Sequence, residues 1–170
     1  NGLIFVEDHV WVEGQINTAR VTIAAARFPD NASLRKNITV NNDLLYTNYD
    51  GQDVIALIAQ NNINVGLFSD NNLQIDGALI AQNGRIGRHY YDPATNGGGT
   101  NRCGVNVYRN SISLFGMLAT NSRYGFAFTN GTGYDTRTIT YDTNLLYAPP
   151  PNFPLASDKY QIILWEELKN

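Results

Sequence analysis

The strongest constraint on the fold is a short repeat in the middle of the chain. Residues 56–63 read ALIAQNNI and residues 78–86 read ALIAQNGRI, so the second copy begins 22 residues after the first. A weaker copy of the Ala-x-Asn ending occurs at 119–121, and residues 22–25 (TIAA) resemble the beginning of the repeat. Repeats of this length are typical of solenoids, in which each repeat packs against its neighbours.

Alternating apolar residues predict that the repeats are β-strands. Three segments share a pattern of alternate apolar residues with a glycine in the third place: 10–16, 73–79 and 112–118. Alternate residues of a strand face the same side. We therefore expect Gly14, Gly77 and Gly116 to point inward in register, leaving room for bulky neighbours. The spacing fits one coil of a right-handed parallel β-helix, and a hairpin duplicated within a β-sandwich is the alternative.

Asparagine is unusually abundant and favours tight corners. The chain has 22 Asn, more than its 15 Asp and Glu together, and 15 Gly. Asn and Gly tolerate the backbone conformations that turns require. In the solenoid, Asn61, Asn83 and Asn121 are expected to line up at one corner, where stacked side chains can form a hydrogen-bonded ladder.

Loop insertions and an unusual tail complete the predicted organisation. The loops are expected at 28–33 and 96–101, and residues 1–140 are expected to form the solenoid coils. Residues 141–170 combine aromatic residues with a proline run and cannot form a central strand, because proline lacks a backbone donor. We predict that this segment is an extended clasp packed on the side of the same domain, ending in a closing strand at 160–165.

Composition excludes several classes of function. The net charge is −3 with no basic run, so nucleic acid is not an expected partner. The single cysteine, Cys103, excludes an internal disulfide and a Cys-based zinc site, and no cofactor is expected. No apolar stretch is long enough to span a membrane. Because the chain begins with Asn1 and its only methionine is Met117, we expect an excised fragment or a processed product, with room for targeting or anchoring sequence upstream.

The two histidines are the first candidates for chemistry. His89 could act as a base oriented by Asp92, although an exposed surface histidine is the simpler interpretation. His9 alternates with Glu7, Trp11 and Glu13, which suggests either a metal cluster or the solvent face of a first strand. We favour the solvent face.

Paired carboxylates are the second candidates, because glycosidases need two carboxyl groups in one cleft. The candidate pairs are Asp50 with Asp53 and Asp70 with Asp76, and Asp70 also begins an oxygen-rich Asp-Asn-Asn run that could bind calcium. These residues stand among Asn and Gly, as turn formers do. Cys103 follows Arg102, which could activate the thiol, but no base accompanies it. Glycosylation sequons begin at three positions: Asn31, Asn37 and Asn130.

Several longer motifs resemble a known family. They are residues 10–14 (VWVEG) followed by 21–25 (VTIAA), residues 53–61 (DVIALIAQN), residues 141–154 (YDTNLLYAPPPNFP) and residues 163–167 (ILWEE). Together these motifs resemble the extracellular C-terminal regions of bacterial PilX-type proteins, which carry a type IV pilin-like membrane helix at their N-terminus. That family is similar to the β-solenoid-bearing minor pilins of competent bacteria. The resemblance assigns no functional residue and implies a membrane attachment through an N-terminal helix that this sequence lacks.

The predicted function is therefore structural or adhesive rather than enzymatic. We expect an extracellular domain of a pilus-associated, minor-pilin-like protein at a bacterial cell surface. Its expected partners are pilins or other surface proteins, with carbohydrate as a further candidate, because Asn and Tyr suit stacking and hydrogen bonding. A β-helical polysaccharide lyase or hydrolase and a trimeric phage or surface receptor-binding fragment remain the alternatives.

Overall fold

The computed structural model describes residues 2–92 and 103–153, which form two parallel β-sheets and two short 3₁₀ helices. The larger sheet contains β1 (Gly2–Val6), β3 (Gly14–Ile16), β4 (Arg20–Ala25), β6 (Leu44–Tyr46), β7 (Val54–Ala59), β9 (Asn72–Ala81), β11 (Tyr108–Thr120) and β12 (Gly133–Tyr141). The smaller sheet contains β2 (Val10–Trp11), β5 (Ile38–Thr39), β8 (Ile63–Val65) and β10 (Ile86–Arg88). The helices are η1 (Gly104–Val107) and η2 (Thr143–Leu146). The described chain is all-β, as predicted.

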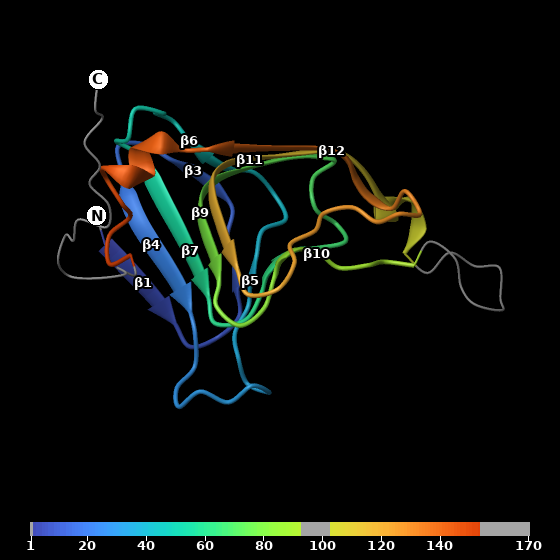
Figure 1. Cartoon of the computed structure of the whole chain (residues 1–170), viewed down its shortest axis with the longest axis horizontal. Helices are drawn as coiled ribbons and strands as arrows, with labels where there is room; N and C mark the ends of the chain where they lie inside the picture. The colour runs from blue at the N-terminus through green and yellow to red at the C-terminus, as the bar shows by residue number, and fades with distance from the viewer. Residues whose placement is uncertain (1, 93–102, 154–170) are drawn as a thin grey trace, which may run out of the picture.

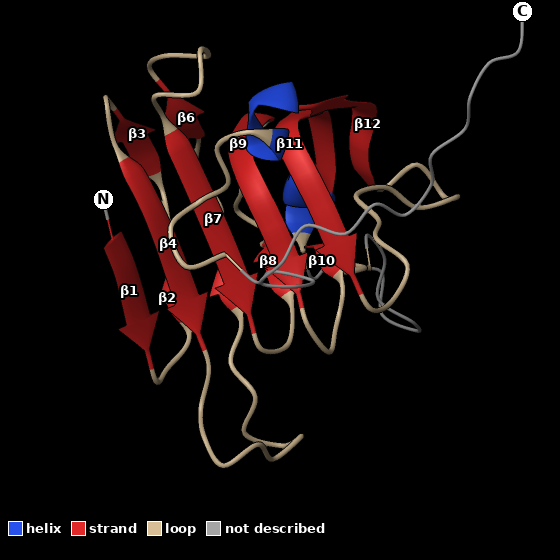
Figure 2. Ribbon diagram, turned by 60° about the vertical axis from the view of Figure 1, so that its left-hand side comes forward, coloured by secondary structure: helices blue, strands red, loops and turns tan. Residues whose placement is uncertain are grey.

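The chain alternates between the two sheets. The main order in the larger sheet is β1-β4-β7-β9-β11-β12, and β3 joins it through β6, which pairs with β9 (Figures 1 and 2). Each strand of the smaller sheet, whose order is β10-β8-β5-β2, lies in sequence between two strands of the larger one. Parallel neighbours cannot be joined by a tight turn, so each passage through the smaller sheet serves as the crossover.

The sequence repeat corresponds to one such passage. Ala56 pairs with Ala78 and Ala59 with Ala81 in parallel register, which excludes the duplicated hairpin. The weaker copy at 22–25 pairs with residues 56–59 on the other side, as expected from its sequence. Paired residues of β4 and β7, such as Arg20 and Val54, are 34 positions apart because the predicted loop at 28–33 lies between them. The predicted loop at 96–101 lies outside the described residues.

Alternation along the strands divides the core from the outer face. Leu57 and Ala59 of β7 point inward with Leu79 and Ala81 of β9, and all four are buried in the main core. The outward residues of β7 and β9 include the small side chains of Ala56 and Ala78. Val54, Ala56 and Ala78 form a separate buried cluster there with Leu145, which follows β12 in sequence.

The predicted glycine register holds for two of the three glycines. Gly116 pairs with Gly77, as predicted. Glycine is needed at these positions for a different reason from the one expected. A Cβ added at Gly116 would lie 2.0 Å from the carbonyl oxygen of Gly77, so the two backbones touch and no bulky neighbour fills the space. The prediction for Gly14 is wrong. The segment 10–16 divides between both sheets, and Gly14 is exposed and pairs with Leu44.

The asparagine side chains that contact each other are not the predicted set of Asn61, Asn83 and Asn121. Asn83 Nδ2 donates to the carbonyl oxygen of Gln60 at 2.7 Å, and Asn121 Nδ2 contacts the carbonyl oxygen of Asn83 at 3.4 Å. These side chains bond to backbone rather than to each other. A direct amide contact instead joins Asn62 Nδ2 to Asn37 Oδ1 at 3.3 Å.

The described part of the tail, up to Phe153, contacts the outer face of the larger sheet. Leu145 is buried on the outer face of the larger sheet. Arg20 Nη2 then donates to the carbonyl oxygens of Ala148 and Pro149 at 2.9 and 2.8 Å. The hydroxyl of Thr22 donates to the carbonyl oxygen of Pro151. The proline run therefore contributes acceptors, and the closing strand at 160–165 lies outside the described residues.

Candidate functional site

The β12 edge of the larger sheet leaves the space between the sheets open. Within the described residues, no strand pairs with the far side of β12. The register with β11 places Arg137 beside Ile112 and Ile139 beside Leu114, so β12 presents these side chains where β11 presents core residues. A groove of about 920 Å³ opens here, and its lining comprises residues 123–129 with Arg85, Arg137 and Ile139.

Close backbone contacts hold the segment 123–129 in place. Gly125 forms a parallel bridge with Gly87, which extends the smaller sheet beyond β10. A Cβ added at Gly87 would lie 2.2 Å from the carbonyl oxygen of Gly125, and one added at Gly133 would lie 2.3 Å from that of Phe126. Only glycine permits such approaches. The groove wall is thus fixed against both sheets.

Aromatic side chains form the floor and the rim of the groove. Phe126 is only 2% exposed and belongs to the main core, whereas Tyr124 is 48% exposed. Their ring centroids lie 6.5 Å apart. Phe128 packs edge-on against Tyr90, and the two ring centroids lie 5.2 Å apart. The buried ring of Phe126 forms the floor, and the exposed ring of Tyr124 is accessible to a ligand.

An apolar pocket of about 480 Å³ continues from the groove. It shares Tyr124 and Ile139 with the groove and adds Met117, Leu118 and Tyr141. An occupant of both spaces would meet charged side chains at one end and apolar ones at the other.

Three arginines give the groove its charge. Arg137 Nη1 donates to the carbonyl oxygens of residues 134 and 135 at 2.6 and 2.7 Å, and Arg85 Nη2 donates to that of Arg88 at 2.8 Å. Arg123 forms no hydrogen bond through its guanidinium in the described part of the chain. The described lining contains no Asp or Glu. The groove is therefore a local cationic surface.

A further arginine is buried behind the groove. Arg88 is fully buried and donates to the carbonyl oxygens of Leu67 and Asn106 at 3.1 and 2.7 Å and to the Ser69 hydroxyl at 2.7 Å. Its guanidinium also lies 5.0 Å from the ring centroid of Tyr91. Burial lowers the pKa of Arg88. No carboxylate forms an ion pair with it among residues 2–92 and 103–153.

The histidine candidates do not form a site in the described structure. His9 lies in the exposed link between β1 and β2, and its Nδ1 accepts a hydrogen bond from the Asn37 amide at 3.0 Å. Glu7, Trp11 and Glu13 are exposed as well, but β1 ends at Val6, so they do not form one strand with His9. The described residues contain no group of three metal-ligating side chains. Burial, together with the positive charge of Arg85, lowers the pKa of His89.

The candidate carboxylate pairs separate into buried and exposed members. Asp53 is fully buried and accepts hydrogen bonds from the amides of Ala19 at 2.9 Å, Asn48 at 2.7 Å and Thr47 at 3.0 Å. Burial opposes its charge, but these hydrogen bonds outweigh that effect and lower the pKa of Asp53. Asp50 is exposed and accepts from the Gln52 amide at 3.0 Å. This pair organises a turn.

Asp76 has an equally structural environment. It is fully buried and accepts hydrogen bonds from the Tyr46 amide at 2.9 Å and the Tyr49 hydroxyl at 2.7 Å. Burial and this hydrogen bond raise the pKa of Tyr49 to about 12. Asp70 is exposed, and its carbonyl oxygen accepts from the Tyr134 hydroxyl at 2.7 Å. Neither pair lines the groove.

The remaining sequence candidates lie elsewhere. Cys103 is half-buried immediately before η1 and forms no disulfide. Two sequon asparagines, Asn31 and Asn130, use their side-chain oxygens to accept from Ser33 at 2.9 Å and Thr132 at 2.8 Å. No helix in the described ranges has the length and apolarity that a membrane crossing needs.

No protein-family model, curated protein or solved structure matches the chain. The resemblance to minor-pilin-like proteins therefore depends on the sequence motifs alone. Sequence reasoning also missed the groove. One available signal was Arg137. It stands beside the core residue Ile112 in the parallel register, at a position where an apolar side chain would be expected.

Proposed function

We propose that this chain is a non-enzymatic adhesive domain that holds its ligand in the arginine-lined groove. In this proposal the two parallel sheets are walls of a right-handed parallel β-helix. The alternation of the chain between the sheets supports it, because parallel crossovers are right-handed in nearly all proteins. Such a scaffold is rigid and leaves its ends available for binding.

The groove is the observation that carries the proposal. Its volume of about 920 Å³ lies within the range of about 300–1,000 Å³ that is typical of ligand sites. It combines the exposed aromatic ring of Tyr124 with the guanidinium group of Arg137. A hydrogen bond to the backbone holds that guanidinium in position without a ligand. The carboxylate pairs that a glycosidase would require are buried or turn-forming and do not line it.

The cellular setting is proposed from the sequence motifs. We place the domain at the bacterial cell surface, associated with a type IV pilus or displayed beside it, with pilins or other surface proteins as assembly partners. Immunogold labelling of sheared filaments from the source cells tests this setting. Label on the filaments is the expected result, and label confined to the cell interior would contradict it.

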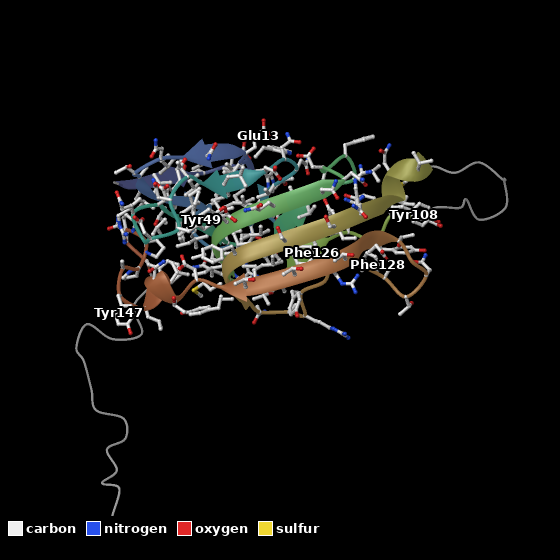
Figure 3. The ribbon with its side chains drawn as sticks, turned by 90° about the horizontal axis from the view of Figure 1, so that it is seen from above. Glu13, Tyr49, Tyr108, Phe126, Phe128 and Tyr147 are labelled. Atoms are coloured by element: carbon white, nitrogen blue, oxygen red, sulfur yellow. The ribbon has the colours of Figure 1, made fainter. Side chains whose placement is uncertain are left out.

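Adhesion is tested with beads coated with the chain and applied to immobilised glycans and host-cell proteins. Tyr124→Ala is expected to reduce retention at least fivefold. Tyr147→Ala is the matched control, because Tyr147 is 88% exposed, does not line the groove or its pocket, and lies away from Phe126 and Phe128 (Figure 3). Equal retention of both variants would contradict a role for the groove. Released oligosaccharide products would favour the lyase or hydrolase alternative, and a stable trimer in solution would favour the receptor-binding alternative.

A further inference from the structure

Arginine outnumbers the acidic residues in the part of the chain that supplies the groove. The whole chain has a net charge of −3. The described residues between Arg85 and Tyr141 nevertheless contain five arginines and only two carboxylates, and no Lys or Glu. The five arginines are Arg85, Arg88, Arg109, Arg123 and Arg137. This part of the chain therefore has a positive net charge, opposite in sign to that of the whole chain, and its exposed arginines attract anions.

The groove arginines keep donors available for a ligand. A guanidinium has five N–H donors. Arg137 uses Nη1 for backbone carbonyls and Arg85 uses Nη2 in the same way, while Arg123 has no such bond in the described chain. These backbone contacts restrain two of the three side chains before a ligand arrives, which lowers the entropy lost on binding. The remaining donors match the two oxygens of a carboxylate.

We propose that the ligand is an acidic glycan whose sugar rings carry carboxylate groups. This inference depends on the proposed function, because it names the ligand class of the same groove. Sugar carboxylates pair with Arg123 and Arg137, and the apolar face of a sugar ring stacks on Tyr124. The adjoining pocket at Met117 and Leu118 takes the less polar face of the next ring.

The charge distribution favours a sugar over a nucleic acid. A nucleic acid presents a phosphate at every nucleotide and needs an extended basic track. Here only three arginines line the groove, and Glu7, Asp8 and Glu13 near the β1 end of the larger sheet are all exposed. An extended polyphosphate would meet repulsion beyond the groove.

Isothermal titration of the whole chain with two oligosaccharides tests the inference. One is a galacturonic acid hexamer, and the other is its methyl ester, which has the same rings without charge. We expect the ester to bind at least tenfold more weakly. Arg123→Gln and Arg137→Gln are each expected to weaken binding of the acid at least fivefold, with unchanged circular dichroism. Arg27→Gln is the matched control, because Arg27 is exposed and outside the groove, and it should leave binding unchanged.

The possible failures separate the two proposals. Equal binding of acid and ester, lost in Tyr124→Ala, would overturn the acidic ligand and leave groove binding intact. Equal binding of single-stranded DNA or of a sulfated glycan would also overturn it, because the groove would then attract any anion. Binding that Arg27→Gln weakens as much as Arg123→Gln would show general surface attraction and overturn it. If the chain adheres to host proteins but binds no glycan, the acidic-glycan ligand is excluded and the adhesive function stands. If no groove variant reduces adhesion or binding, the proposed function is excluded as well.

Discussion

At the scale of single residues, backbone contact between Gly77 and Gly116 constrains the stacking of β9 and β11. A Cβ at Gly116 would clash with a carbonyl oxygen at 2.0 Å, and the φ of 143° is also unfavourable for other residues. Gly116→Val should destabilise the fold by more than about 3 kcal/mol. Gly77→Val should cost on the order of 1–3 kcal/mol, because its Cβ would lie 3.1 Å from the Ile55 carbonyl oxygen.

Urea unfolding monitored by circular dichroism measures both variants. Gly2→Val is the control, since a Cβ at Gly2 meets nothing within 4 Å and should change stability by less than about 0.5 kcal/mol. A wild-type midpoint for Gly116→Val would contradict the register of β9 and β11.

Asp53 should make stability depend on pH. Its folded-state pKa is lowered below the ordinary value of 3.8, so its contribution is present above that pH and is lost as pH falls through the folded pKa. Asp53→Asn should cost about 1–3 kcal/mol at neutral pH, because an amide nitrogen replaces an acceptor for backbone N–H groups. The difference from wild type should shrink as the pH falls below 3.8 toward the folded-state pKa.

Thermal melts between neutral pH and acid check this dependence, with Asp135→Asn as the exposed control. A stability difference for Asp53→Asn that is the same at all pH values would rule out the charge of Asp53 as its cause.

At the scale of elements, η2 and the following prolines depend on the outer face of the larger sheet. Leu145 is 7% exposed against Val54, Ala56 and Ala78, whereas its neighbour Leu146 is 66% exposed. Leu145→Ala should therefore cost about 2–3 kcal/mol and Leu146→Ala less than about 0.5 kcal/mol. Denaturant midpoints of this adjacent pair measure the clasp directly. Equal midpoints would mean that the segment contributes nothing to stability.

At the scale of the whole molecule, the two ends of the larger sheet differ in character. β1 is an edge strand whose Leu3, Ile4 and Phe5 are about half exposed, while the β12 edge presents threonines and Arg137. Exposed apolar edges promote association between molecules. Ile4→Lys should therefore lower concentration-dependent association in sedimentation velocity. Val105→Lys, at an 80% exposed residue of η1, should not, and an equal effect of both would point to general charge repulsion.

The sequence by itself determined the local elements of this protein. Alternation and the repeat at 56 and 78 predicted parallel strands in register, since both signals belong to residues that are close in sequence. The bulk of Leu145 and the missing donors of the prolines likewise predicted a segment packed outside the sheet.

Only the tertiary structure decided how separate segments meet. The chain turns after Trp11 from the smaller sheet to the larger one, so Gly14 does not share a strand face with Val10. The alternation of apolar residues continues through this turn and therefore does not reveal it. The groove brings together Arg85, Arg123 and Arg137 from three segments. Their spacing in the sequence depends on loop insertions of different length, so no sequence period relates them. Alternation specifies which side of a strand a residue faces. The pairing of distant strands specifies what that side meets, and here it left the end beside β12 open and positively charged.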